Sequence, residues 1–241
     1  MPDTVDLLAV FQRIYVINLP ERKDRRDEME AELAHLGLSL TDNRVILFEA
    51  SRPNDAGKFP SRGARGCFES HLRVHQDILA TEVDHALILE DDASFVSDFA
   101  KRFGQLRPYL NGGSWDLFMS VGTLSPRHEE KVIQTDLLEL RPDSIVNLSH
   151  FLGVSRACSK AVVPYFEAML ARNEGDPAGG PMHVDGAYNW FRRAHPELTV
   201  VATRTPLALQ RSSRSDIAPP KPWHRIPGVH GLIRRMKRLG R

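Results

Sequence analysis

The chain has 241 residues, of which 41% are hydrophobic and 26% charged, and its formal net charge is +1. This length is sufficient for one large α/β domain or two small ones, each with a sizeable core. No apolar run approaches the length of a membrane span, and the balanced charge gives no reason to expect a nucleic-acid partner.

A strand and a cationic helix are predicted first. Residues 13–19 are β-branched and aromatic, as in a buried strand, and Pro20 then begins a helix that extends to about residue 35. Cations oppose the dipole at a helix N-terminus, yet the first turns hold Arg22, Lys23, Arg25 and Arg26. A bound phosphate would explain them, and so would a solvated face on which neighbouring acids pair with them. Both interpretations stay open.

The next elements are a strand at residues 44–48, a polar loop at 51–65 and a helix from Gly66 onward. His71 and His75 lie on or beside the apolar stripe of this helix, where a histidine is more often a hydrogen-bonded core residue than a ligand. A third strand follows at residues 86–89.

The third strand continues directly into the carboxylates Glu90, Asp91 and Asp92. Side chains alternate along a strand, so we expect Glu90 and Asp92 to share one face and Asp91 to point to the other. Like charges this close repel by several kcal/mol at an effective dielectric of ~20, so one carboxylate is protonated or a cation lies between them. The plainer alternative is an acidic turn that ends a core strand.

The order strand, helix, strand, helix, strand predicts a parallel sheet with right-handed crossovers. Ligands of such sheets bind beyond the carboxyl ends of the strands. Asn18, the arginines that follow it and the cluster of Glu90 to Asp92 should therefore lie on one rim and face one pocket.

The second half of the chain continues with helices and strands. The predicted strands are 115–119, 151–154 and 198–202, with a β-hairpin within 131–148 that turns at 141–143. The predicted helices are 95–110, 159–172 and one that begins near His183 and carries Asp185 in its first turn.

The C-terminal part differs in composition from the rest. Residues 212–222 are polar and proline-rich, and we expect a boundary at 217/218 between a main domain and a tail. After Pro222 the tail combines six arginine or lysine residues with apolar residues at helical spacing, which is typical of a basic amphipathic helix on an anionic membrane surface. A disordered tail or a helix packed on a partner chain are the alternatives. The acidic residues at the N-terminus predict no export, hence a cytoplasmic protein peripheral to the inner face of the membrane.

Several segments, in order over residues 14–217, resemble glycosyltransferase family 25, which includes lipopolysaccharide β-galactosyltransferases and collagen galactosyltransferases. Residues 17–26 resemble the family's N-L-x-x-R-x-D-R-R opening, residues 66–71 its G-C-F-x-S-H segment and residues 87–92 its hydrophobic-E-D-D segment. Weaker matches are Gly153-Val154 before Ser159, Val184-Asp185 with His183 in place of the family's proline, and Pro206, Gln210 and Ser215-Asp216.

The resemblance implies an α/β fold of GT-A type with a mostly parallel central sheet flanked by helices. It also implies inverting transfer of a hexose, usually galactose, from a UDP-sugar to a glycan or lipid-linked glycan such as a lipopolysaccharide core. Mn²⁺ or Mg²⁺ is expected at Glu90 and Asp92, because hard carboxylate oxygens suit these ions.

The other site assignments are weaker. Asn18 is expected to contact the nucleoside, Arg22 and Arg25 the pyrophosphate, and Asp91 the ribose or the ion's surroundings. The resemblance places Ser70 and His71 near the donor, Asp216 in a closing loop and Asp185 as the general base, with His183 as the weaker alternative. A metal-dependent phosphohydrolase and a non-catalytic sugar-binding member are the other functions that this pattern allows.

Overall fold

The computed structural model describes residues 7–120, 123–124, 130–147 and 150–211. Asp216, the proline-rich segment from Ser212 and the basic tail lie outside the described residues, as does the predicted boundary at 217/218. Among the described residues, no helix combines the length and apolarity needed to cross a bilayer.

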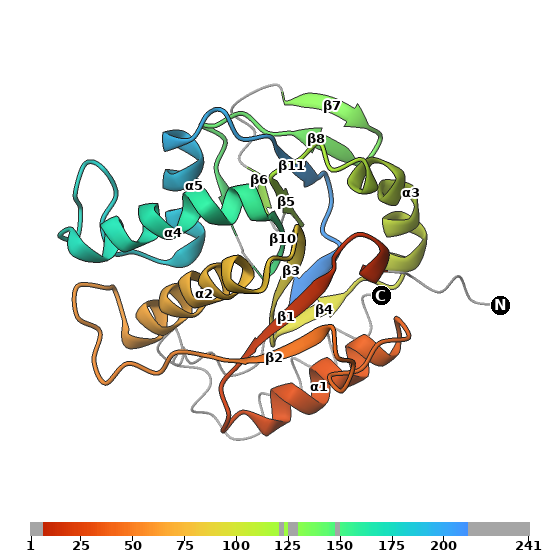
Figure 1. The fold of residues 1–241 in the computed structure, drawn as a ribbon, viewed down its shortest axis with the longest axis horizontal. Coiled ribbons are helices and arrows are strands. Elements are labelled where there is room, and N and C mark those ends of the chain that lie inside the picture. The colour runs from red at the N-terminus through yellow and green to blue at the C-terminus, as the bar shows by residue number, and fades with distance from the viewer. Residues whose placement is uncertain (1–6, 121–122, 125–129, 148–149, 212–241) are drawn as a thin grey trace, which may run out of the picture.

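Helices and strands alternate along the chain (Figure 1). The helices are η1 (Leu7–Ala9), α1 (Lys23–Ala34), α2 (Arg62–Thr81), α3 (Phe99–Asn111), α4 (Arg156–Ala171) and α5 (Val184–Ala194). The strands of the large sheet are β1 (Arg13–Asn18), β2 (Val45–Glu49), β3 (His85–Glu90), β5 (Leu117–Met119), β7 (Lys131–Gln134), β8 (Leu137–Glu139), β10 (Phe151–Ser155) and β11 (Val200–Thr203). Two small sheets pair β4 (Ala93–Phe95) with β12 (Ala208–Gln210) and β6 (Thr123–Leu124) with β9 (Val146–Asn147).

The large sheet has the order β2-β1-β3-β10-β5-β11-β8-β7. The predicted α/β class, with a large central sheet flanked by helices, is confirmed. The strands β2, β1 and β3 are parallel as predicted, but β10 runs antiparallel to both β3 and β5, and β8 runs antiparallel to β11. The sheet is therefore mixed rather than mostly parallel, because β10 is inserted from later in the chain instead of following β3 through a helical crossover.

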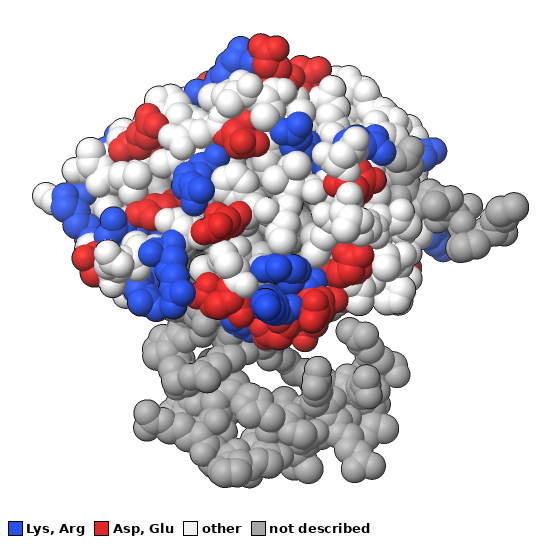
Figure 2. Space-filling model, turned by 60° about the horizontal axis from the view of Figure 1, so that its bottom comes forward, with Lys and Arg blue, Asp and Glu red and all other residues white. Residues whose placement is uncertain are grey.

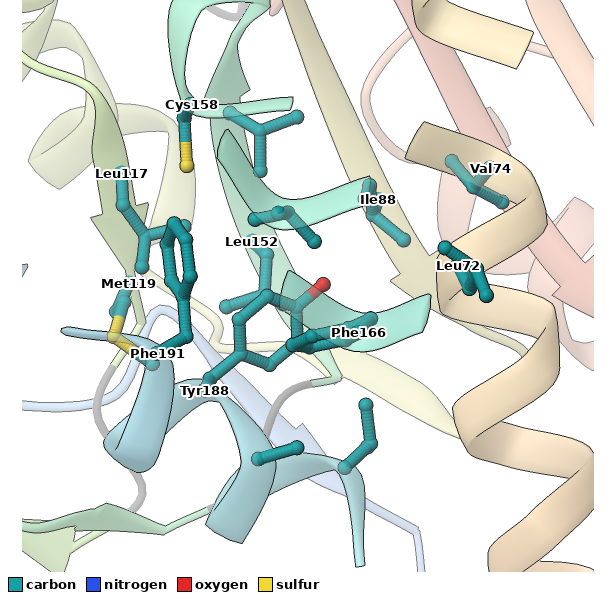
Figure 3. Close-up of a cluster of buried hydrophobic side chains, with 14 of the residues drawn as sticks. Leu72, Val74, Ile88, Leu117, Met119, Leu152, Cys158, Phe166, Tyr188 and Phe191 are labelled. Carbon is teal, nitrogen blue, oxygen red and sulfur yellow. The ribbon is translucent and has the colours of Figure 1, made fainter. Parts of the chain in front are cut away.

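Helices cover both faces of the sheet, and strand alternation divides the core between them. Along β3, Ala86 and Ile88 pack in the cluster formed with α2, α4 and α5, whereas Leu87 and Leu89 pack in the cluster formed with α1 and α3. Figure 3 shows part of the first cluster, in which Phe166 of α4 and Tyr188 of α5 pack beside Leu152 of β10. Continuation of this alternation directs Glu90 toward α2.

The predicted hairpin turn at 141–143 is wrong. The chain turns between β7 and β8 at Thr135 and Asp136. Arg102 of α3 fixes this turn by donating from Nε to Asp136 Oδ2 at 2.9 Å. Residue 141 is instead held against α5, because the buried Arg192 donates to its carbonyl oxygen at 2.7 Å. These tertiary contacts, which local sequence does not reveal, decide where the chain reverses.

Charges of both signs are interspersed over the face of the described part shown in Figure 2. This pattern agrees with the formal net charge of +1.

Candidate active site

The parallel strands β1 and β3 end side by side, and Ile17 is in register with Glu90 (Figure 1). The residues that follow the register pair are therefore neighbours: the Asp91 amide donates to Ile17 O at 3.2 Å, and Asn18 Nδ2 donates to Asp91 Oδ2 at 2.8 Å. Asn18 and Asp91 are both buried, so this amide–carboxylate bond is shielded from water. The structure brings together two residues that are 73 positions apart in the sequence.

The cationic start of α1 faces the same rim. Arg25 donates from Nη1 to Asp91 Oδ1 at 2.7 Å and lies 3.6 Å from Asp92 Oδ2. Arg22 instead forms two hydrogen bonds to Asp24, at 2.8 and 3.0 Å, and these hold the pKa of Asp24 at about 2. Arg26 donates to Pro20 O at 3.1 Å. Arg25 thus contacts the acidic cluster, and Arg22 has the acidic neighbour that the salt-bridge interpretation requires.

Asp92 is buried with incomplete hydrogen bonding. Its Oδ2 accepts a bond from Gln210 Nε2 of β12 at 3.2 Å, whereas its Oδ1 is buried and has no hydrogen-bond partner among the described residues. Burial, and next the charge of Glu90, raise the pKa of Asp92 to about 7, an effect that Arg25 partly offsets. An unbonded carboxylate oxygen beside a second carboxylate fits a divalent cation with oxygen ligands.

Glu90 lies on the opposite face of β3 from Asp91, toward α2. Its Oε1 is 3.7 Å from Cys67 Sγ and 3.5 Å from His71 Nε2. Burial, and next the charge of Glu90, raise the pKa of the Cys67 thiol well above its ordinary value. β3 itself ends at Glu90, so Asp92 lies in the following turn, where its contacts are Arg25 and Gln210.

Asp185 occupies the first turn of α5 and is half-buried. Its Oδ1 accepts a hydrogen bond from the Gly186 amide at 2.9 Å. Its charge also contributes to the raised pKa of Cys67, which places Asp185 within electrostatic reach of the Glu90 side of the rim. His183 is the exposed N-cap residue of the same helix.

Ser70 and His71 are fully buried. Ser70 donates to Gly66 O at 2.6 Å and accepts a bond from the Ser51 amide at 2.8 Å, and so ties the polar loop to α2. His71 Nδ1 lies 3.1 Å from the Tyr188 hydroxyl. Both hydrogen bonds of Ser70 are therefore to backbone atoms and structural. His71 contacts the rim through Nε2, which lies 3.5 Å from Glu90 Oε1.

The structure adds residues to which the sequence assigned no role. Arg211 donates to Ala93 O at 3.0 Å and pairs with Glu28 at 3.1 Å, which fixes the loop after Asp92 against α1. Local sequence carries no signal for Arg211, because its partners come from distant segments. The signal in the sequence for Cys67 beside His71 is their spacing, because residues four apart on a helix lie on one face.

Comparison with known proteins gives relatives of one kind. "Inactive glycosyltransferase 25 family member 3" of Homo sapiens is 25% identical over 237 residues, which is 88% of this chain and 40% of that protein. "Procollagen galactosyltransferase 2" of Homo sapiens is 28% identical over 142 residues, which is 51% of this chain and 23% of that protein. The chain thus spans 40% of the length of the first of these relatives and 23% of the second.

Solved structures also match this chain. A 4-diphosphocytidyl-2C-methyl-D-erythritol synthase from Anaerococcus prevotii matches with a TM-score of 0.44 and 13% identity, over 89% of this chain and 79% of that one. A glycosyltransferase involved in glycosylation of the major capsid of PBCV-1 matches with a TM-score of 0.36 and 13% identity, over 79% and 92%.

The family comparison covers the rim itself. A model described as "Glycosyltransferase family 25 (LPS biosynthesis protein)" matches residues 11–152, more than half of the chain, and this range contains Asn18, Arg25 and Glu90 to Asp92. The resemblance inferred from the sequence is confirmed, and the chain belongs to glycosyltransferase family 25.

Proposed function

We propose that this protein is a metal-dependent inverting glycosyltransferase that transfers a hexose, galactose, from a UDP-sugar to a hydroxyl group of a glycan such as a lipopolysaccharide core. The observation that carries the proposal is the contact of Asn18 and Arg25 with Asp91 at the carboxyl ends of β1 and β3. Family membership and a relative named a procollagen galactosyltransferase support the choice of reaction and sugar.

The donor would lie along this rim, with its nucleoside near Asn18 and its pyrophosphate near Arg22 and Arg25. The contact with Asp91 holds the Arg25 guanidinium at the strand ends, where arginine can present several donors to phosphate oxygens. Asp91 would then orient Arg25 and Asn18 toward the donor, or contact the ribose.

Glu90 and Asp92 would hold the divalent cation, Mn²⁺ or Mg²⁺. Asp92 Oδ1 supports this assignment, because it is buried without a hydrogen-bond partner among the described residues. When bound, such an ion supplies charge neutralisation for the departing UDP.

Asp185 would act as the general base. The acceptor hydroxyl oxygen attacks the anomeric carbon, the bond from that carbon to the UDP oxygen breaks, and the hydroxyl proton passes to the Asp185 carboxylate. Attack opposite to the leaving group inverts the configuration. The half-buried position of Asp185 in the first turn of α5 supports this role, because its charge acts on Cys67 beside Glu90.

A turnover assay tests this function. UDP release from UDP-galactose with an acceptor glycan should require Mn²⁺ or Mg²⁺, stop in EDTA, and fall by about 100-fold or more in Asp92→Asn, because the leaving-group charge loses its stabilisation. Gly104→Ala, a change on the exposed face of α3, is the matched control and should retain the rate. Full turnover in EDTA, or an unimpaired Asp92→Asn protein, would refute the metal role. Release of inorganic phosphate from simple phosphoesters would instead indicate a phosphohydrolase.

A specific observation supports a second candidate, a non-catalytic sugar-nucleotide-binding protein. The relatives whose names include "inactive" match over 237 residues, whereas the procollagen galactosyltransferase matches over 142. Calorimetric titration separates the two: UDP with Mn²⁺ should bind in either case, and binding without turnover on any donor and acceptor pair favours this second function.

A further inference from the structure

Cys67, His71 and Glu90 form a compact cluster with one thiol, one imidazole and one carboxylate. Cys67 and His71 come from successive turns of α2, and Glu90 is the last residue of β3. Their ligand atoms all lie within 4.8 Å of one another. This donor set differs from the oxygen-only set of Glu90 and Asp92, because sulfur and imidazole nitrogen suit zinc-like ions better than Mg²⁺ or Mn²⁺.

The two separations measured from Glu90 Oε1 are close to the separations between ligand atoms around a tetrahedral zinc ion. Zinc bonds of about 2.3 Å to sulfur, about 2.0 Å to nitrogen and about 2.0 Å to oxygen give ligand separations of about 3.3 Å for nitrogen–oxygen and about 3.5 Å for sulfur–oxygen at the tetrahedral angle. The observed separations from Glu90 Oε1 are 3.5 Å to His71 Nε2 and 3.7 Å to Cys67 Sγ. Movements of a few tenths of an ångström would bring these two separations to tetrahedral values, and the third separation, between Cys67 Sγ and His71 Nε2, is within 4.8 Å.

A buried hydrogen-bond chain holds the His71 ring in place. The Ser159 hydroxyl lies 3.2 Å from the carbonyl oxygen of Ser155 and 2.9 Å from His75 Nδ1. His75 Nε2 is hydrogen-bonded to the Tyr188 hydroxyl at 2.8 Å, and the same hydroxyl lies 3.1 Å from His71 Nδ1.

The other ring nitrogen of His71, Nε2, points to the cluster and lies 3.5 Å from Glu90 Oε1. His71 is 0% exposed, and its Nε2 has no hydrogen-bond partner among the described residues. Histidine ligands of metals characteristically have the opposite ring nitrogen held by a second partner, as Tyr188 holds His71 Nδ1.

The cluster is also accessible. Cys67 is half-buried and the Glu90 side chain is 16% exposed, so an ion can enter and its fourth coordination position can hold water.

We propose that Cys67, His71 and Glu90 bind one zinc-class divalent ion, with Cys67 as the thiolate ligand. Binding replaces the thiol proton, which leaves to solvent. One consequence rests on the proposed function: because Glu90 would serve both ions, zinc would inhibit the transferase by withdrawing Glu90 from the Mn²⁺ or Mg²⁺ position.

Cobalt titration tests the site without any reliance on turnover. Co²⁺ added to the metal-free full chain should give a thiolate-to-cobalt charge-transfer band together with tetrahedral ligand-field bands, and one equivalent of Zn²⁺ should remove both. Cys67→Ser should abolish the charge-transfer band and weaken Zn²⁺ binding by at least about tenfold. Cys158→Ser is the matched control, since Cys158 lies in the apolar cluster of Figure 3, and it should leave both properties unchanged.

A second measurement uses the unaltered protein and so does not depend on the folding of a variant. Zn²⁺ should protect Cys67 from alkylation, as read by peptide mass, whereas Mg²⁺ should not. Absence of Co²⁺ binding, Co²⁺ binding without a charge-transfer band, or alkylation of Cys67 at the same rate with and without Zn²⁺ would each overturn the proposal. None of these results depends on glycosyl transfer. The zinc-site proposal can therefore be refuted while the proposed transferase function stands, and the transferase function can be refuted while the zinc site stands.

Discussion

Two adjacent carboxylates at the end of β3 have different environments. Asp91 accepts bonds from Asn18 and Arg25, whereas Asp92 keeps one buried oxygen without a partner among the described residues. Strand alternation predicts that Glu90 and Asp92 share one face and that Asp91 points to the other. The contacts of Glu90 and Asp91 differ as predicted, whereas Asp92 contacts Arg25 as Asp91 does. The contacts of Asp92 could not be predicted in this way, because they depend on the turn after β3 and on Gln210 of β12, a residue 118 positions away.

Asp92 makes stability depend on pH in a direction that can be measured. Burial and Glu90 raise its folded-state pKa from 3.8 to about 7, so between these values the folded protein holds a proton that the unfolded chain has lost. Stability therefore decreases as the pH rises from about 4 to about 7, by an amount on the order of a few kcal/mol. In EDTA, Asp92→Asn should remove this slope and melt at a higher temperature than the parent at pH 8.

The measurement is the melting temperature of both proteins across pH 4 to 8. The two curves should converge near pH 4, where Asp92 is protonated in the folded state. Melting-temperature curves that stay parallel over the whole pH range would contradict this prediction, because ionisation of Asp92 would then not lower the stability of the folded protein.

Helix and strand boundaries were predictable where the local sequence determines them and not where distant contacts do. The strands β1 and β3 were identified because long apolar runs are strong signals. The sequence predicts a start of α2 at Gly66, but the helix begins at Arg62, where the Ser61 hydroxyl caps it by accepting from the Ala64 amide at 3.0 Å. The strands β4 and β12 were missed, because each has three residues and is defined by its pairing with the other.

Gly66 lets α2 approach the preceding loop. A Cβ at this position would lie 2.6 Å from the backbone oxygen of Ser51, and backbone cannot move aside as a flexible side chain can. We expect Gly66→Ala to reduce the free energy of unfolding by about 1–3 kcal/mol through this overlap. Gly104→Ala in α3, where a Cβ meets nothing within 4 Å, should raise it by about 0.5–1 kcal/mol.

Denaturant unfolding of the parent and both variants measures these differences. Equal stabilisation by the two alanines would show that the loop at Ser51 is not packed against α2 as described.

At the scale of the whole molecule, the site forms where segments distant in sequence converge on one rim. The βαβ rule was sufficient to predict that Asn18, the arginines after it and the cluster of Glu90 to Asp92 lie on one rim, but not that Asn18 and Arg25 both bind Asp91. The rule could not predict that β10 enters the sheet antiparallel between β3 and β5, because this position depends on how the strands of the second half of the chain pair with one another. The contribution of Gln210 and Arg211 likewise depends on the return of the chain beside β4.

The basic segment after Pro222 is outside the described residues, and its role rests on its sequence alone. We propose that it holds the protein on the anionic inner face of the membrane, because its cations and apolar residues separate at helical spacing. Removal of residues 223–241 should weaken co-sedimentation with anionic vesicles and leave turnover on a soluble acceptor unchanged. Equal vesicle binding by both proteins would exclude this role.

The most direct test of the account is a screen of UDP-sugars with Mn²⁺ and a glycan acceptor mixture, with product mass as the readout. We predict that UDP-galactose alone among the common UDP-sugars gives a product one hexose heavier than its acceptor, and that EDTA abolishes it. A protein that yields no hexose addition from any UDP-sugar, or yields it equally in EDTA, would contradict a metal-dependent transferase centred on Asp91 and Asp92.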